Sequence, residues 1–114
     1  MTADEALASV PTPIIVGISR YSVQVVDVVD AEDDECKAVI DHNSQTIKIG
    51  RDHATAALVV GSLIHEALHA IWDEQGLKAR ETEERAIVGL ERGLVGLLGD
   101  NPKLVRWIVR GLKK

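Results

Sequence analysis

At 114 residues, the chain is long enough for one domain with a modest hydrophobic core and too short for two. Hydrophobic residues make up 46% of it and charged residues 27%, which predicts a globular fold and excludes extended disorder. The formal net charge of −5 argues against nucleic acid as a partner, because phosphate binding needs clustered Lys and Arg. The basic C-terminal end, from Arg106 to Lys114, is interpreted as a solvated last helical turn.

The sequence also bears on the compartment. Cys36 is the only cysteine, which excludes an internal disulfide framework and is typical of a reducing environment. The acidic N-terminus is not followed by the apolar segment of a signal peptide. No apolar run approaches the roughly 18 residues that a membrane span needs. The sequence therefore predicts a cytoplasmic protein without a membrane partner, and it leaves the oligomeric state open.

The first half of the chain has the pattern of β-strands. Pro11-Thr12-Pro13 excludes a helix there, and β-branched residues follow. From Thr46 to Ile49 polar and apolar residues alternate, so one face of that strand should be buried and the other solvated. The acidic run at 31–35 lacks the glycine and terminal Glu of a calcium loop, and we interpret it as a solvated loop. Four strands are expected, at 14–16, 21–28, 36–40 and 45–49.

The second half has a helical composition. Three helices are expected, over residues 54–75, 81–98 and 102–112. Asp52 is a plausible N-cap for the first of them, and Gly76 is a natural stop after it. Apolar residues occur all round this first helix, which predicts that it is buried within the domain. Together the patterns predict one α+β domain over 1–114, β-rich at 13–50 and α-rich at 52–114, with a small, mainly antiparallel sheet.

The first long helix contains His65-Glu66-Ala67-Leu68-His69, which has the pattern His-Glu-x-x-His. Side chains four residues apart lie one turn apart on the same helix face, so both imidazoles can bind one metal ion. Glu66 projects beside them, where it can take a proton from water that the metal activates. Polar side chains on a buried helix cost free energy unless something satisfies them, and a metal would do so. The motif therefore predicts a Zn²⁺ site.

A catalytic zinc needs three protein ligands and one open position for water. Three glutamates interrupt or flank the apolar arc of the second helix, and each is a candidate for the third ligand: Glu83, Glu84 and Glu91. Asp73, four residues after His69, is a candidate for orienting a ligand imidazole, with a plain surface aspartate as the alternative.

A peptidase also needs a hydrogen-bond donor for the oxyanion that forms during hydrolysis. Tyr21, His42 and Arg51 are candidates, and the sequence does not choose among them. His53, like His42, precedes the motif and is interpreted as a substrate-side or surface residue. If the strand at 46–49 is the sheet edge, it could bind an extended peptide by strand addition.

His65-Glu66-Ala67-Leu68-His69, followed by Glu84-x-x-Ile87-x-x-Leu90 and then Asp100-Asn101-Pro102, resembles a group of small metallopeptidases from phages and prophages. These proteins are zincin-like, have a glutamate third ligand, and are related to repressor-cleaving metallopeptidases and more distantly to SprT-like proteins. The resemblance runs from the strand at 46–49 to about Trp107. It implies a minimal zincin-like fold, a peptide or protein substrate and, for a phage-encoded protein, the host cytoplasm.

Carried over residue by residue, the resemblance implies that His65, His69 and Glu84 bind zinc and that Glu66 is the general base. The repressor-cleaving relatives carry Asn four residues after the glutamate ligand. Here position 88 is Val, and counting from Glu83 instead places Ile at that point, so Glu83 remains the alternative third ligand.

Three functions are consistent with these features. The first is a zinc-dependent metallopeptidase, and the second is a non-catalytic zinc-binding regulatory or interaction module on the same fold. The presence of Glu66 favours the first, because a structural zinc needs no general base. The third is a partner-binding module that uses the amphipathic C-terminal helix, although core packing is the simpler interpretation of that helix.

Overall fold

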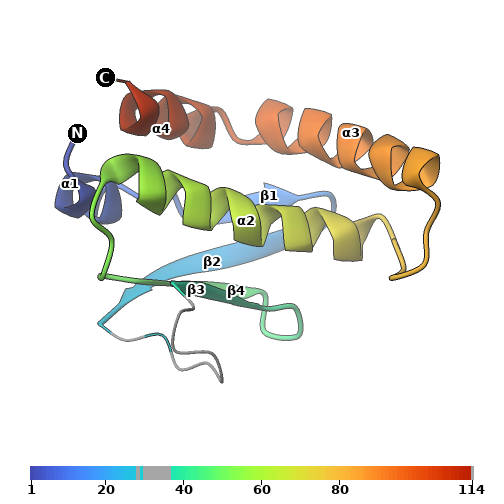
Figure 1. Ribbon diagram of the computed structural model, residues 1–114, viewed down its shortest axis with the longest axis horizontal. Coiled ribbons are helices and arrows are strands. Elements are labelled where there is room, and N and C mark those ends of the chain that lie inside the picture. The colour runs from blue at the N-terminus through green and yellow to red at the C-terminus, as the bar shows by residue number, and fades with distance from the viewer. Residues whose placement is uncertain (28, 30–36, 114) are drawn as a thin grey trace.

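The computed structural model describes residues 1–27, 29 and 37–113 and has an α+β fold (Figure 1). In chain order the elements are α1 (Ala3–Ala8), β1 (Ile14–Val16), β2 (Ser19–Val26), β3 (Ala38–Asp41), β4 (Thr46–Gly50), α2 (Ala56–Glu74), α3 (Glu83–Asp100) and α4 (Pro102–Leu112). The predicted strands and long helices are confirmed in type and order. The short helix α1, closed by a capping box between Thr2 and Glu5, was not predicted. Cys36 and the acidic run at 31–35 lie outside the described residues.

The four strands form one mixed sheet in the order β1-β2-β4-β3. The β1–β2 and β3–β4 pairs are antiparallel, whereas β2 and β4 run parallel, with Val23 opposite Ile47. The expectation of a mainly antiparallel sheet agrees with this pairing. The idea that residues 46–49 form the sheet edge is wrong, because β4 lies between β2 and β3. Among the described strands the edge on this side is β3.

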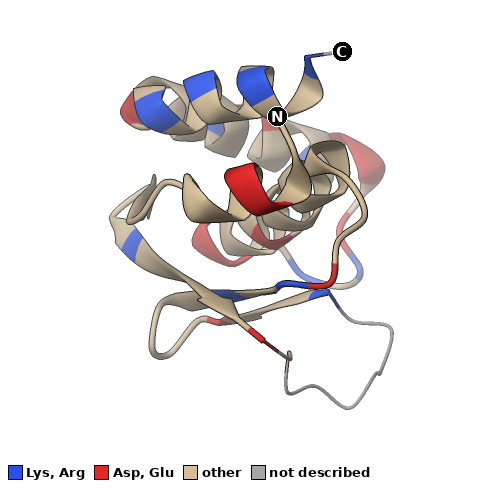
Figure 2. Ribbon diagram, turned by 90° about the vertical axis from the view of Figure 1, so that its left-hand side faces the viewer, with Lys and Arg blue, Asp and Glu red and all other residues tan. Residues whose placement is uncertain are grey.

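The helices lie on one face of the sheet in two layers (Figure 1). Helix α2 packs directly on the sheet, α4 packs on α2, and α3 packs on α2 and also contacts the edge strand β1. The core contains fully buried aliphatic side chains from the sheet and from α2, among them Ile47, Ile49, Val59 and Leu63. Lys and Arg residues recur along α4, as the blue segments of its ribbon show (Figure 2). No helix in the described part of the chain is long and apolar enough to cross a membrane.

Helix α2 begins later than predicted. Its N-cap is Thr55, whose side-chain oxygen accepts a hydrogen bond from the backbone N–H of Leu58 at 3.2 Å. The prediction of Asp52 as the N-cap is wrong, because the Asp52 carboxylate forms an ion pair with Lys37 Nζ at 2.9 Å instead. Similarly, α3 is capped by Thr82 and begins two residues after the predicted start. In both helices a threonine side chain caps the first turn.

The prediction that α2 is buried on every side is also wrong. The sheet, α3 and α4 cover most of its circumference, but a strip between them stays open. Leu58 is 56% exposed and Leu68 is 36% exposed, and His65 and His69 lie on the same open strip. Glu66 alone of the three motif side chains is buried. The histidines therefore face solvent, where an incoming ion or substrate can reach them.

Glycines allow α3 to approach α2 closely. A Cβ atom added at Gly93 would overlap Cγ2 of Ile71, whereas one added at Gly96 would meet nothing within 4 Å. We therefore expect Gly93→Ala to destabilise the protein by about 1–3 kcal/mol through overpacking. Gly96→Ala should leave the stability unchanged or raise it by up to about 1 kcal/mol, because Ala favours the helix. Urea unfolding of the two variants tests this pair, and equal stability would contradict the packing of α3 on α2.

Candidate metal centre

The two motif histidines point toward each other from consecutive turns of α2. His65 Nε2 and His69 Nε2 lie 3.2 Å apart, with the ring planes at 66°. Zinc–nitrogen bonds of about 2.0–2.1 Å at a tetrahedral angle require the two nitrogens to lie roughly 3.3 Å apart. The observed separation fits that requirement. A hydrogen bond between the rings would also bring the nitrogens together, but only with the proton on Nε2 of one ring and Nδ1 of the other.

Glu66 lies behind the histidine pair, toward the sheet. It is the one charged residue that is buried among the described residues, with 5% exposure. Burial raises the pKa of the Glu66 carboxyl above its ordinary value, and the nearby His65, His69 and His42 lower it by a smaller amount. No hydrogen bond to Glu66 is found within the described part of the chain. A carboxylate with this environment is suited to hold and release a proton.

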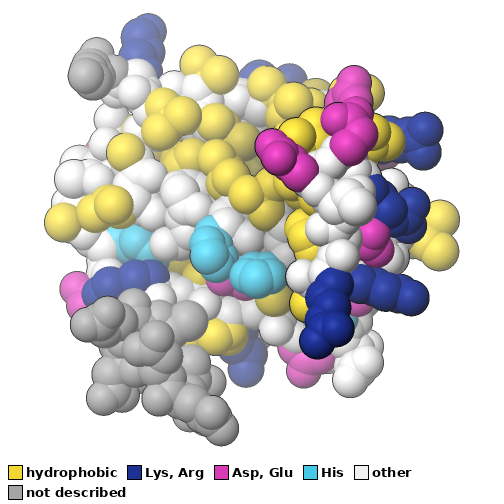
Figure 3. Space-filling view, turned by 45° about the vertical axis from the view of Figure 1, so that its right-hand side comes forward, with side chains coloured by type: hydrophobic (Ala, Val, Ile, Leu, Met, Phe, Trp, Pro, Cys, Tyr) yellow, Lys and Arg dark blue, Asp and Glu magenta, His cyan; other side chains and the backbone are white. Residues whose placement is uncertain are grey.

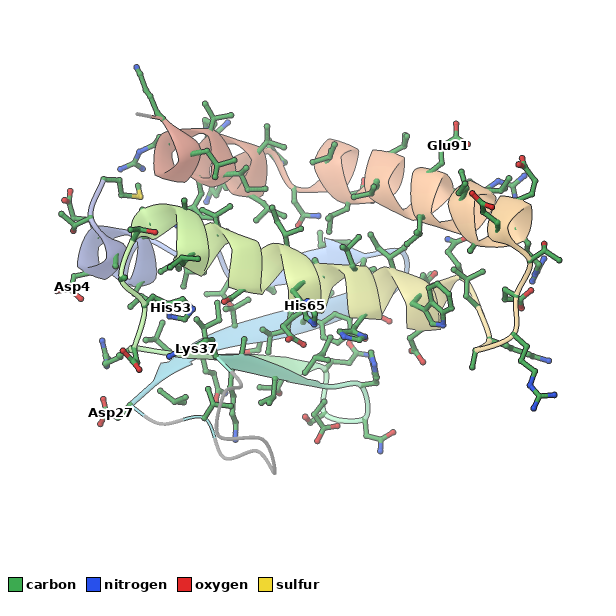
Figure 4. The ribbon with its side chains drawn as sticks, viewed as in Figure 1. Asp4, Asp27, Lys37, His53, His65 and Glu91 are labelled. Carbon is green, nitrogen blue, oxygen red and sulfur yellow. The ribbon has the colours of Figure 1, made fainter. Side chains whose placement is uncertain are left out.

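Two cavities flank the histidines. The first, of about 420 Å³, is lined by Lys37 and Ala38 at the sheet edge and by Leu58, Gly61, Ser62, His65 and Glu66 of α2. The second, of about 360 Å³, is lined by His65, Leu68, His69, Trp72 and Leu90. His65 lines both cavities, so the pair stands where they meet. Figure 4 shows His65 projecting from the middle of α2, with Lys37 nearby at the sheet edge.

The predicted third ligand does not join the pair. Glu83 and Glu84 are exposed in the first turn of α3, and Glu91 projects from α3 away from α2 (Figure 4). Among the described residues, no group of three or more His, Cys, Asp or Glu side chains could hold a metal. The α3 residue beside the histidines is Leu90. Glu83 is on nearly the same helix face as Leu90 but about 10 Å further along the axis.

Two of the three oxyanion candidates, Tyr21 and His42, lie together beside the end of α2. The Tyr21 hydroxyl is 3.0 Å from His42 Nδ1, and that nitrogen is 3.8 Å from Asp73 Oδ2. His42 is also near enough to lower the pKa of Glu66. Burial raises the pKa of Tyr21, and the negative charge of Asp73 adds to this effect.

Two further candidates remain: Arg51, the third oxyanion candidate, and Asp73, the candidate for orienting a ligand imidazole. Arg51 Nε lies 2.9 Å from Asp27 Oδ1. The strand register places both residues at the opposite end of the sheet from the Tyr21–His42 pair. The structure therefore does not bring Arg51 to the histidines. Asp73 is paired with His42 rather than with His69, so it lies where it can orient an oxyanion donor instead of a ligand imidazole.

One polar network beside the site was not predicted. His53 Nδ1 lies 2.8 Å from the carbonyl oxygen of Gly50, and its Nε2 lies 2.8 Å from Ser62 Oγ. A carbonyl can only accept, so Nδ1 carries the proton and, in the neutral ring, Ser62 donates to Nε2. This network ties the end of β4 to the helix turn that lines the first cavity. No spacing rule links a loop histidine to a serine nine residues later, so the sequence offers no signal for it.

Comparison with protein-family models, with curated proteins and with solved structures finds no match to this chain.

Proposed function

We propose that this protein is a zinc-dependent metallopeptidase with a minimal zincin-like fold. His65 and His69 would hold the zinc ion, and Glu66 would act as the general base. The observation that carries the proposal is the 3.2 Å separation of the two Nε2 atoms, combined with a buried glutamate on the same cavity as His65. For a phage-encoded protein, the host cytoplasm would be the site of action.

When bound, zinc would act as a Lewis acid that polarises the scissile carbonyl and acidifies water in the cavity. Glu66 would accept the proton of the attacking water on its carboxylate and deliver it to the nitrogen of the departing amine. The carbonyl carbon thereby gains a bond to oxygen and loses its bond to nitrogen. The raised pKa of Glu66 supports this role, because a base whose pKa lies closer to neutrality also returns the proton readily.

His42 is the residue that we propose for stabilising the oxyanion. The Tyr21 hydroxyl and Asp73 lie on its Nδ1 side and orient the ring, so Nε2 would be the atom offered to a substrate. In its charged form His42 would present an N–H donor at Nε2. Tyr21 is then a positioning residue rather than a donor to the substrate.

Glu84 is the proposed third ligand, with Glu83 as the alternative. Both side chains are exposed and lie at the start of α3, so either requires this first turn to move toward the histidines. A non-catalytic zinc-binding module remains the competing function, and it differs in predicting that Glu66 is dispensable for whatever the protein does.

Metal analysis tests the proposal. Protein purified without chelator should contain one zinc ion per chain. Glu84→Ala should weaken zinc binding by at least about 100-fold, more than the loss of an orienting residue costs. Glu91→Ala is the matched control, because Glu91 is exposed on the same helix and points away from α2.

The possible results separate the ligand assignments. If Glu83→Ala weakens zinc binding and Glu84→Ala does not, the third ligand is Glu83. If Glu83→Ala, Glu84→Ala and Glu91→Ala all bind zinc equally well, α3 does not supply the third ligand. Absence of stoichiometric zinc in the unmodified protein would contradict the proposed function.

A further inference from the structure

A third cavity, of about 230 Å³, lies between α2, α3 and α4. Every residue that lines it is hydrophobic. Its floor includes the buried side chains Leu63, Leu97 and Leu104, one from each helix. Because the floor is built from all three helices, the cavity is a recess in the packed domain rather than one exposed helix face.

The rim of this cavity is open to solvent and adjoins the histidines. Leu68, Leu94 and Leu98 line the cavity and are 36%, 36% and 47% exposed. Leu68 also lines the cavity that contains His65 and His69. Residues three apart on a helix have Cβ atoms about 5–6 Å apart, so the rim begins one side chain away from His65. Figure 3 shows hydrophobic side chains gathered beside the paired histidines on this face.

We propose that this recess, here called the leucine pocket, receives a large apolar side chain of the substrate next to the scissile bond. This inference rests on the proposed function and names its substrate class: peptides with Leu, Met or Phe at that position. An engineered apolar cavity of about 150 Å³ in another protein binds benzene, so 230 Å³ accommodates an aromatic ring or a branched aliphatic side chain.

The lining also selects against polar side chains. It offers no side-chain hydrogen-bond partner, so a charged or amide side chain would lose its hydration on entry without compensation. An apolar side chain gains the transfer free energy of each buried methylene group, and one such group in a hydrophobic pocket discriminates by roughly 10- to 200-fold. Selection should therefore follow side-chain size as well as polarity.

Peptide binding tests the leucine pocket. The probes are acetyl-Ala-Gly-X-Ala-amide peptides with X = Leu, Phe, Ala, Lys or Asp, titrated into zinc-loaded Glu66→Gln protein and into the metal-free chain. Methyl NMR reports on Leu94 and Leu98 directly. The Leu and Phe peptides should bind at least about tenfold more tightly than the other three and shift both leucine methyls.

Two matched variants test whether the preference for Leu and Phe arises at the leucine pocket. Leu98→Glu puts a charge on the rim and should remove the preference for Leu and Phe. Val95→Glu adds the same charge to the same helix at a residue that is 69% exposed and does not line the pocket, so it should keep the preference. Circular dichroism confirms that both variants are folded. Equal binding of all five peptides, or equal loss in both variants, would overturn the inference.

The outcomes also separate this inference from the proposed function. Zinc binding and peptide cleavage without any preference for X would contradict the leucine pocket alone. A preference for Leu and Phe without zinc binding would contradict the metallopeptidase and leave an apolar-ligand pocket. A concentration-dependent dimer that Leu98→Glu abolishes would show that a second copy of the chain covers the rim, and would overturn the inference.

Discussion

Replacing Glu66 with Gln should lower the rate of peptide hydrolysis by about 10²- to 10⁴-fold while one zinc ion per chain is retained. Gln has nearly the shape of Glu and fits the same site, where the side chain is 5% exposed. Its amide cannot accept the proton of the attacking water, so proton transfer is lost without removal of a proposed ligand. The measurement is kcat/KM on a cleaved peptide, with zinc content determined on the same samples.

Glu91→Gln is the control for this substitution, because Glu91 is exposed on α3 and points away from α2. It should retain full activity. Hydrolysis that persists in Glu66→Gln with zinc bound would contradict the role of Glu66 as the base. Activity absent from the unmodified, zinc-loaded protein on a broad peptide pool would favour the non-catalytic module.

The stability of the same variant reports whether Glu66 is as buried as the structure indicates. Burial raises the pKa of Glu66 in the folded chain above the ordinary 4.5, so in the pH window above 4.5 the folded state binds more protons than the unfolded state. The free energy of unfolding therefore falls as pH rises through that window. Gln does not titrate, so the metal-free variant should be more stable than the unmodified protein at pH 8, and the difference should shrink toward pH 4.

Much of the fold follows from local patterns in the sequence. The alternation from Thr46 to Ile49 predicted β4, and the helical composition with Gly76 at its end predicted α2. The spacing of His65 and His69 placed both side chains on one face, because helix geometry alone fixes that relation. These features depend on residues close together in the chain, which is why the sequence could predict them.

The failures involve contacts between distant segments. The position of β4 inside the sheet depends on parallel pairing with β2, about 24 residues away, and no local pattern encodes it. The open strip on α2 depends on where α3 packs: Gly93 of α3 lies against Ile71, whereas Leu68 stays partly exposed. Composition alone cannot show which side of an apolar helix its neighbours will cover.

The candidate site also has one part that the sequence could predict and one part that it could not. The histidine pair and Glu66 lie on one helix and could be predicted together. The link from Tyr21 to His42, and from His42 to Asp73, joins β2, the turn after β3 and the end of α2. Three segments meet there through tertiary packing, so the sequence supplied the candidates but could not choose among them.

Removal of either histidine should abolish the stabilisation that zinc confers. An ion that binds only the folded chain stabilises it by RT ln(1 + [Zn²⁺]/Kd), about 2.7 kcal/mol at a free concentration of 100 Kd. We expect thermal unfolding of the unmodified protein to shift upward with added zinc and to return with a chelator. His65→Ala and His69→Ala should each show no shift at the same zinc concentration, because the remaining imidazole and one glutamate would bind the ion far more weakly than three ligands.

His42→Ala is the matched control for both variants. His42 is paired with Tyr21 and Asp73 and stands outside the Nε2–Nε2 pair, so its removal should leave the zinc-dependent shift intact. An equal loss in all three variants would indicate that zinc binds to histidines without regard to the motif. A full shift in His65→Ala would mean that the ion lies elsewhere, since the geometry that fits zinc requires both imidazoles of α2.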